Sequence, residues 1–176
     1  MKRLRKFMRA LLVLLMATSI TMVTAQSKLK IGDKAPTFTG KDQDGKAISL
    51  SSLQGKKVVL YFYPKDQTPG CTAEACNLRD NIDMLTQQGY VILGVSTDDE
   101  ASHREFREKY KLPFALIADT DKSINQQYGV WVEKERDGKK FMGTARTTFL
   151  IDEKGVITDI ISNVDTANHA AQIVKQ

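Results

Sequence analysis

The stretch Pro-Lys-Asp-Gln-Thr-Pro-Gly-Cys at residues 64–71 joins a strand pattern to a helix pattern. The preceding residues 58–63, Val-Val-Leu-Tyr-Phe-Tyr, form a short apolar run of β-branched and aromatic side chains, which predicts a buried strand. After the stretch, apolar residues recur three or four positions apart, which predicts a helix that ends at Gly89. Cys71 therefore lies where a strand passes into a helix.

The start of this predicted helix makes Cys71 a candidate nucleophile. Thr68 is a favourable N-cap residue, and Pro69 suits the first helical position because its missing N–H needs no partner there. Cys71 then falls in the first turn, where free N–H groups and the helix dipole favour a thiolate. An ordinary cysteine is only about 3% ionised at pH 7, and bringing its pKa near 6 needs roughly 3.4 kcal/mol. Since the dipole supplies at most ~2 kcal/mol, a nearby cation is also required.

Strand and helix patterns alternate along the rest of the chain. The apolar segment 90–96 predicts a second buried strand. The other predicted elements are a hairpin over Phe38–Leu50, a helix over 102–111, a strand over 114–117, a helix over 123–128, a turn at 137–138, a hairpin of 147–151 with 156–161, and a helix capped by Thr166 that runs to Val174. This order predicts an α/β fold with a mixed central sheet flanked by helices and an N-terminal β-hairpin.

Residues 1–25 differ from the rest of the chain. Five basic residues precede an uncharged stretch whose apolar part, residues 10–17, is far shorter than the ~20 residues of a membrane-spanning helix. Val23 and Ala25 are small residues at the positions preferred before signal cleavage. We expect a signal peptide cut after Ala25, export to the periplasm or cell envelope, and residues 26–176 as one domain without stable membrane association. An uncleaved anchor is the alternative.

The charge of the predicted mature chain and its metal-ligand content exclude several functions. The full chain has 26 Lys and Arg against 21 Asp and Glu, and the five charges of the leader are all basic, so the mature chain is formally neutral. Nothing in this balance favours nucleic-acid binding. His103 and His169 lie on polar helical stretches, where we expect them to face solvent. With two cysteines and two histidines at no metal-ligand spacing, we expect no metal and no cofactor.

The second cysteine, Cys76, follows Cys71 by five residues. In an exported protein such a pair could be a structural disulfide. On an intact α-helix, however, residues i and i+5 have Cα atoms about 8.7 Å apart, beyond the ~7 Å that a disulfide can span. A bond would require the first helical turns to unwind, which suits a transient catalytic disulfide better than a permanent one.

Further motifs follow in a fixed order along the chain. They are Tyr61-Phe62-Tyr63-Pro64-Lys65, Thr68-Pro69-Gly70-Cys71-Thr72, Cys76, Leu78-Arg79-Asp80, Gly94-Val95-Ser96-Thr97-Asp98, Tyr128-Gly129-Val130-Trp131 and Arg146-Thr147-Thr148-Phe149-Leu150-Ile151-Asp152. Together they resemble the peroxiredoxin family, and within it the bacterioferritin comigratory protein (PrxQ-type) branch. The resemblance covers nearly everything from Gly32 to the last helix, and it implies a thioredoxin-like fold.

The resemblance implies a thiol peroxidase that reduces hydrogen peroxide and organic hydroperoxides. In that family Cys71 corresponds to the peroxidatic nucleophile and Cys76 to an intramolecular resolving cysteine. A thioredoxin-like dithiol protein then reduces the disulfide, and no metal, flavin or haem takes part. The branch is often monomeric, so a monomer is expected.

The resemblance also implies roles for residues whose ordinary explanations are simpler. Arg146 would contact both the cysteine and the peroxide, although most arginines at the start of a strand are solvated. The Thr68 hydroxyl would donate to the thiolate or bind peroxide, although Thr68 could be only an N-cap. The Pro64 ring would shield the site from water, or it could merely end the strand. Glu74 is left without a role, as an acid that the helix dipole favours.

Two other functions remain as alternatives. A thioredoxin-like thiol-disulfide oxidoreductase of the cell envelope would need a second cysteine at position 74, where the chain has Glu74. It would also place a cis-proline before a late strand, where the chain reads Arg146-Thr147-Thr148. The third possibility is an envelope domain with a structural disulfide and no activity.

Overall fold

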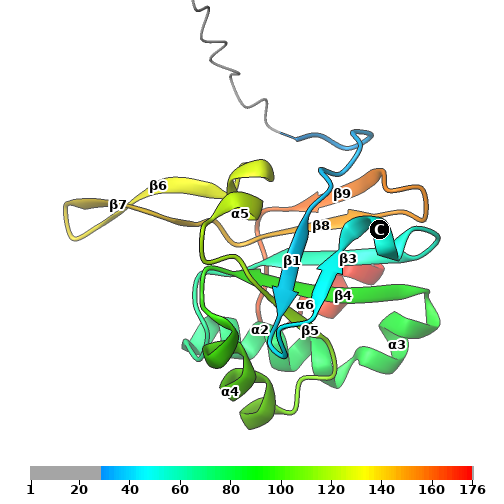
Figure 1. The fold of residues 1–176 in the computed structure, drawn as a ribbon, viewed down its shortest axis with the longest axis horizontal. Helices are drawn as coiled ribbons and strands as arrows, with labels where there is room; N and C mark the ends of the chain where they lie inside the picture. The colour runs from blue at the N-terminus through cyan, green and yellow to red at the C-terminus, as the bar shows by residue number, and fades with distance from the viewer. Residues whose placement is uncertain (1–28, 176) are drawn as a thin grey trace, which may run out of the picture.

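The computed structural model describes residues 29–175, and its main feature is a seven-stranded sheet (Figure 1). The strand order is β2-β1-β5-β4-β3-β8-β9. The strands are β1 Thr39–Asp42, β2 Ala47–Ser49, β3 Lys57–Phe62, β4 Tyr90–Ser96, β5 Ala115–Ala118, β8 Thr147–Ile151 and β9 Ile157–Ile161. β3, β4 and β5 run parallel, whereas β1–β2, β1–β5, β3–β8 and β8–β9 pair antiparallel. The predicted α/β class with a mixed sheet and an N-terminal hairpin is confirmed.

Strand β3 lies near the middle of the sheet because both of its faces are apolar. Successive side chains of a strand point to opposite faces. Val59, Tyr61 and Tyr63 belong to one buried core. Val58, Leu60 and Phe62 belong to the other. The predicted buried strand over 58–63 is therefore confirmed, and its end delivers the chain to the stretch that carries Cys71.

The helices cover both faces of the sheet. They are α2 Pro69–Asp80, α3 Ile82–Gln87, α4 Glu100–Tyr110, α5 Ser123–Gln127 and α6 His169–Val174, with a short 3-10 helix η1 at Leu50–Leu53. Side chains of α2, α3, α4 and α6 pack into the core that contains Tyr61. Those of α5 pack into the core that contains Phe62, on the opposite face (Figure 1).

The helix predicted from Cys71 to Gly89 is two helices, and that prediction is wrong at Asn81. The backbone of Asn81 leaves the helical region at φ −112°, ψ 17°, and its Nδ2 donates to the carbonyl of Asn77 at 2.8 Å. Asparagine side chains compete for backbone groups in this way and so interrupt helices. The break separates the helix that holds both cysteines, α2, from α3.

Two other helix starts differ from the prediction. Helix α4 begins at Glu100, two residues early, because the Asp99 carboxylate caps it by accepting from the Ser102 N–H at 2.8 Å. Helix α6 begins at His169 and not directly after Thr166. There the Asp165 carboxylate accepts from the Ala167 N–H at 3.1 Å, which holds the intervening residues in a turn.

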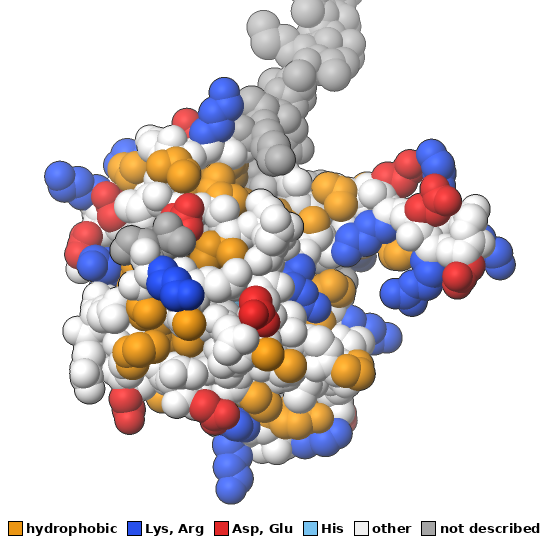
Figure 2. Space-filling model, turned by 180° about the vertical axis from the view of Figure 1, so that it is seen from behind, with side chains coloured by type: hydrophobic (Ala, Val, Ile, Leu, Met, Phe, Trp, Pro, Cys, Tyr) orange, Lys and Arg blue, Asp and Glu red, His pale blue; other side chains and the backbone are white. Residues whose placement is uncertain are grey.

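A two-stranded arm stands out from the body, formed by β6 Trp131–Arg136 and β7 Lys139–Thr144 (Figure 1). Its turn at residues 137–138 was predicted, but its strands were not. The strands are mostly exposed and carry Lys, Arg and Glu, so they lack the apolar alternation that reveals a strand in sequence. Figure 2, viewed from behind, shows side chains of both charges along this arm.

The predicted signal peptide, residues 1–25, lies outside the described residues. Within residues 29–175, no helix combines the length and apolar character needed to cross a membrane.

Candidate active site

Cys71 lies in the first turn of α2 and is buried, with 1% of its surface exposed. Thr68 occupies the N-cap position and Pro69 the first helical position, as predicted. The Thr68 side chain makes no capping hydrogen bond, however: its Oγ1 donates to the carbonyl of Lys65 at 3.0 Å. The first-turn N–H groups therefore receive no cap from Thr68, and the positive end of the helix dipole lies at the turn that carries Cys71.

Arg146 provides the cation beside this sulfur. Its Nη2 donates to Cys71 Sγ at 3.3 Å, and its Nη1 donates to Glu74 Oε2. Strand β8 pairs antiparallel with β3, with Thr147 opposite Phe62, and this pairing brings Arg146 to the end of β3. Gly70 lies directly beside the guanidinium, since a Cβ there would be 3.4 Å from Arg146 Nη2.

The charge of Arg146 is stabilised by its neighbours. Burial lowers the pKa of Arg146, but the Glu74 carboxylate and the Cys71 sulfur outweigh burial, so the net pKa is raised. Arg146 is therefore a permanent cation, and its two terminal nitrogens contact different groups, Nη2 the sulfur and Nη1 the carboxylate. A planar guanidinium offers such a fixed fork, which a lysine ammonium does not.

Glu74 and His169 lie at the site, although the sequence left Glu74 without a role and indicated a solvated His169. Glu74 is fully buried, and its Oε1 lies 3.2 Å from His169 Nδ1. His169 was predicted to face solvent, which is wrong: it is fully buried, and its Nε2 lies 3.0 Å from Thr148 Oγ1. The sequence did carry a signal for Glu74: it follows Cys71 by three residues, and residues three apart share a helix face. No local signal places His169 there, because α6 reaches α2 only through tertiary packing.

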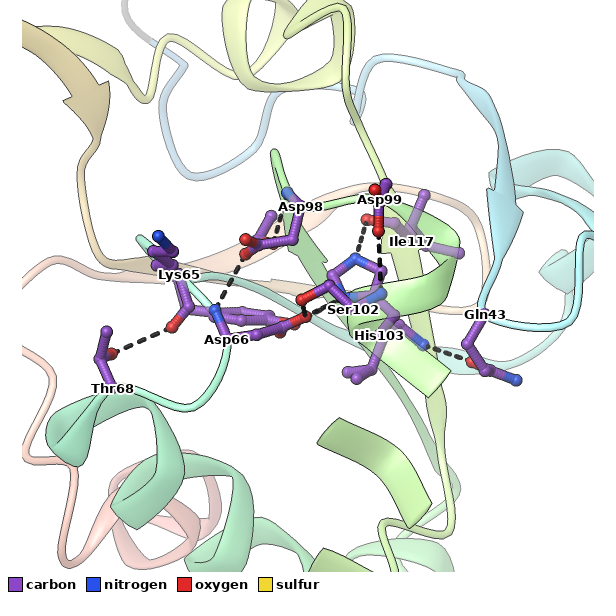
Figure 3. Close-up of polar contacts among 12 residues, drawn as sticks. Gln43, Lys65, Asp66, Thr68, Asp98, Asp99, Ser102, His103 and Ile117 are labelled. Carbon is purple, nitrogen blue, oxygen red and sulfur yellow. Dashed lines mark hydrogen bonds and ion pairs between the residues drawn. The ribbon is translucent and has the colours of Figure 1, made fainter. Parts of the chain in front are cut away.

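The loop between β3 and α2 is held by a buried polar cluster around Asp66 (Figure 3). The Asp66 carboxylate accepts from Tyr63 Oη at 2.7 Å and Ser102 Oγ at 2.8 Å, and it lies 2.8 Å from His103 Nδ1. The Asp66 N–H donates to Asp98 Oδ2 at 2.9 Å. These bonds fix the loop to α4 and to the end of β4, and so they fix the entry to the cysteine helix.

His103 was also predicted to face solvent, and this too is wrong. It is fully buried, with Nε2 3.2 Å from the carbonyl of Ile117 (Figure 3). Its helix reads as polar, but Phe106 follows three residues later on the same face and is fully buried. That i, i+3 pair was the available signal for a buried histidine.

Pro64 begins this loop directly after Tyr63 and is half-buried. The shielding role expected for its ring stays a prediction.

Cys76 lies on the same unbroken helix as Cys71, and both are free thiols. Cys76 is half-buried, and Arg79 lies beside it. The middle of α2 is joined to α6 by Asn77, whose Nδ2 donates to the Ala167 carbonyl at 2.7 Å and whose Oδ1 accepts from the Ala170 N–H at 2.8 Å. A bond between the two cysteines would require this part of α2 to open.

Among residues 29–175, no group of three or more His, Cys, Asp or Glu side chains is arranged to hold a metal ion. The features that converge on Cys71 are a helix N-terminus, a guanidinium and a buried carboxylate. A helix N-terminus and a guanidinium both stabilise a thiolate, so the arrangement favours a nucleophilic cysteine.

Comparison with known proteins identifies the family of this chain. Residues 31–160 match the AhpC/TSA family, and the chain belongs to this family. The predicted resemblance to peroxiredoxins of the bacterioferritin comigratory type is therefore confirmed.

Individual relatives agree with the family assignment. The chain is 51% identical to the putative peroxiredoxin bcp of Coxiella burnetii over 83% of its own length and 97% of the relative. It is 47% identical to peroxiredoxin Bcp of Escherichia coli K12, over 80% and 90% of the two chains. A structure of the Xanthomonas campestris bacterioferritin comigratory protein, concerned with its alkyl peroxide reduction activity, matches with a TM-score of 0.74 at 33% identity, over 78% and 88%. The thioredoxin-like fold predicted for the chain is thereby confirmed.

Proposed function

We propose that this peroxiredoxin reduces hydrogen peroxide and organic hydroperoxides with Cys71 as the peroxidatic nucleophile. The observation that carries the proposal is the 3.3 Å contact between Arg146 Nη2 and the buried Cys71 Sγ at the start of α2. The guanidinium stabilises the thiolate and is placed to hold the peroxide oxygen that leaves. The Xanthomonas relative, which reduces alkyl peroxides, supports the inclusion of organic substrates.

The first step consumes one peroxide. The Cys71 thiolate attacks the terminal oxygen of ROOH, the O–O bond breaks, and Cys71 becomes a sulfenic acid while RO⁻ leaves and takes up a proton to give ROH. Thr68 and Pro64, at the entry to the helix, are proposed to bind the peroxide and to exclude water.

The second step uses Cys76 as the resolving residue. Its thiol condenses with the Cys71 sulfenic acid, an S–S bond forms, and water is released. An external dithiol protein of the thioredoxin type then exchanges with this disulfide and returns both thiols. Cleavage after Ala25 would place the enzyme in the periplasm or cell envelope, so the reductant would be an exported thioredoxin-like protein.

Reaction with one equivalent of peroxide tests this function and separates it from the alternatives. The mature chain from Gln26, fully reduced, should lose both thiols and form an intramolecular disulfide. A thioredoxin-like oxidoreductase would keep its thiols under the same brief exposure. A structural disulfide would already be present after purification and would resist mild reductant.

Two cysteine variants assign the roles. Cys71→Ser should abolish peroxide consumption, because no other residue serves as nucleophile; substantial remaining turnover would contradict the mechanism. Cys76→Ser should still consume one peroxide, lose its remaining thiol and accumulate a sulfenic acid that dimedone traps. If Cys76→Ser instead recycled normally with a dithiol reductant, Cys76 would not be the resolving residue.

A further inference from the structure

The buried Glu74 has one partner on each side. Its Oε2 accepts from Arg146 Nη1, and its Oε1 lies 3.2 Å from His169 Nδ1. Oε1 and Nδ1 are buried and have no other polar partner among the described residues, so each faces only the other. Glu74 and His169 are both fully buried, and a buried carboxylate is strongly destabilising unless it is compensated.

His169 is itself held in place by the strand that follows Arg146. Its Nε2 lies 3.0 Å from Thr148 Oγ1, and Thr148 is fully buried on β8. The contacts therefore form a chain from Thr148 through His169, Glu74 and Arg146 to Cys71 Sγ. Since a hydroxyl either donates or accepts, this contact persists whether His169 is neutral or protonated.

Two anions compete for one guanidinium when Cys71 ionises. The thiolate and the Glu74 carboxylate are both buried, and both contact Arg146. A like charge nearby disfavours ionisation, whereas an opposite charge favours it. If His169 stabilises the Glu74 carboxylate, that carboxylate competes less strongly with the Cys71 thiolate for Arg146. The guanidinium then stabilises the thiolate more strongly.

We propose that His169 is a positioning residue for the peroxide reaction. It contacts the Glu74 oxygen that does not bind Arg146, and by stabilising this carboxylate it leaves Arg146 Nη2 free to stabilise the Cys71 thiolate. The inference rests on the proposed function only for its effect on peroxide. Its effect on Cys71 ionisation stands independently.

The remaining titratable groups around the pair do not take over this role. Tyr61 of β3 packs edge-on to the His169 ring at 6.4 Å, and burial, followed by Glu74, raises the pKa of Tyr61 so that it stays neutral. Lys134 of β6 is close enough to be affected by Arg146 and Cys71, and burial, followed by Arg146, lowers the pKa of Lys134. The Lys134 ammonium donates to the Thr144 carbonyl and has no contact with Glu74 among those described.

The test compares His169→Gln, Glu74→Gln and the double variant, each in a Cys76→Ser background so that only Cys71 reacts. The measurements are the pH midpoint of iodoacetamide alkylation and the second-order rate constant with hydrogen peroxide. His169→Gln should raise the midpoint by roughly one pH unit and slow the peroxide reaction about tenfold at pH values well below the midpoint, because the thiolate fraction falls there. Glu74→Gln should lower the midpoint, because one competing anion is gone.

The double variant distinguishes positioning from simple structural damage. Once Glu74 is neutral, the loss of His169 should no longer matter, so the double variant should recover the midpoint of Glu74→Gln alone. If His169→Gln leaves the midpoint unchanged, or if the double variant is as impaired as His169→Gln, the proposal is wrong. Urea denaturation shows which variants fold, and the conservative His169→Asn serves as the second variant if His169→Gln does not.

A matched control lies on the opposite face of the sheet. Ile157 is fully buried in the other core, so Ile157→Ala should lower stability and leave the midpoint unchanged. A shift in this control of the same size as in His169→Gln would overturn the proposal. If the parent protein alkylates normally but does not react with peroxide, the proposed function fails while the alkylation series still decides the role of His169.

Discussion

Residues 29–175 contain two buried pairs of a carboxylate and a histidine, and the two pairs differ in what contacts the other side of the carboxylate. In the loop before α2, Asp66 faces His103 at 2.8 Å. In α2 itself, Glu74 faces His169 at 3.2 Å. Asp66 receives its other bonds from the hydroxyls of Tyr63 and Ser102, whereas Glu74 receives its other bond from the guanidinium that contacts Cys71.

The far nitrogens of the two histidine rings differ as well. His103 Nε2 faces the Ile117 carbonyl, which can only accept, so this nitrogen carries a hydrogen. His169 Nε2 faces the Thr148 hydroxyl, which either donates or accepts. The His103 pair is therefore fixed in one hydrogen-bond arrangement and suits an anchor. The His169 pair can keep its contact with Thr148 in either orientation of that hydroxyl, and it adjoins the guanidinium that contacts Cys71.

The largest effect should come from replacing the group that makes the two pairs different. Arg146→Lys removes the fork that spans Cys71 and Glu74, and a point ammonium cannot contact both in the same geometry. We expect the rate constant with hydrogen peroxide to fall about 100-fold or more, measured by stopped flow. Arg104→Lys, at an exposed arginine that donates to the Gln43 carbonyl, is the control and should react normally. An unchanged rate in Arg146→Lys would show that the peroxide reaction does not need the guanidinium fork.

The sequence predicted the fold well because the burial of the central strands is evident from their own apolar residues. The run 58–63 is apolar on both faces, and the cysteine follows it directly, so strand, turn and helix were readable. The arm of β6 and β7 was not, because its exposed charged residues resemble a loop. Cys71, Cys76 and Arg146 were found through spaced motifs, and the structure brings Arg146 to Cys71.

Both buried histidines and Glu74 escaped prediction for one physical reason. A charged or polar residue on a short helix looks the same in sequence whether it faces solvent or a buried partner. Its partner lies far along the chain: Glu74 is 72 residues from Arg146, and His103 is 37 from Asp66. Only the packing of α6 on α2 and of α4 against the loop reveals these pairs.

A smaller effect should separate two adjacent tyrosines, one from each region. Tyr61 and Tyr63 are both almost fully buried, and their rings stack at 5.4 Å. The Tyr63 hydroxyl donates to Asp66, whereas the buried Tyr61 hydroxyl has no hydrogen-bond partner among the described residues. Tyr63→Phe should therefore lower the free energy of unfolding by about 1.5–3 kcal/mol, because Asp66 loses a donor. Tyr61→Phe should leave it unchanged or raise it.

Urea denaturation of the two tyrosine variants gives a direct comparison, since each loses one oxygen from a buried ring at or directly after the end of β3. Equal losses of stability would mean that the Asp66 cluster is no anchor.

The smallest effect concerns the part of α2 that lies between the two regions. Asn77, next to Cys76, joins α2 by one hydrogen bond to α6 and by another to Ala167 in the turn before α6. Formation of the proposed disulfide requires α2 to open there, whereas the Asp66 cluster can stay closed. Asn77→Ala removes about 1 kcal/mol of this resistance, so the step from sulfenic acid to disulfide should speed up about fivefold. Rapid quenching after one equivalent of peroxide, with counting of disulfide, measures the step.

Hydrogen exchange shows whether the opening is local. In the wild type, oxidation should speed exchange over residues 71–79 and leave the loop around Asp66 protected. The bonds of Asp66 to Ser102 of α4 and to Asp98 do not involve α2. For the Asn77→Ala measurement, Thr86→Ala is the matched control. The Thr86 hydroxyl bonds only to the carbonyls of Ile82 and Asp83 on α3, so its loss should leave the disulfide step unchanged. Identical protection in the reduced and oxidised forms would show that the helix need not open. Loss of protection in both regions would show that the loop around Asp66 and the start of α2 unfold as one unit. The two acid–histidine pairs would then differ in their contacts but not in their local stability.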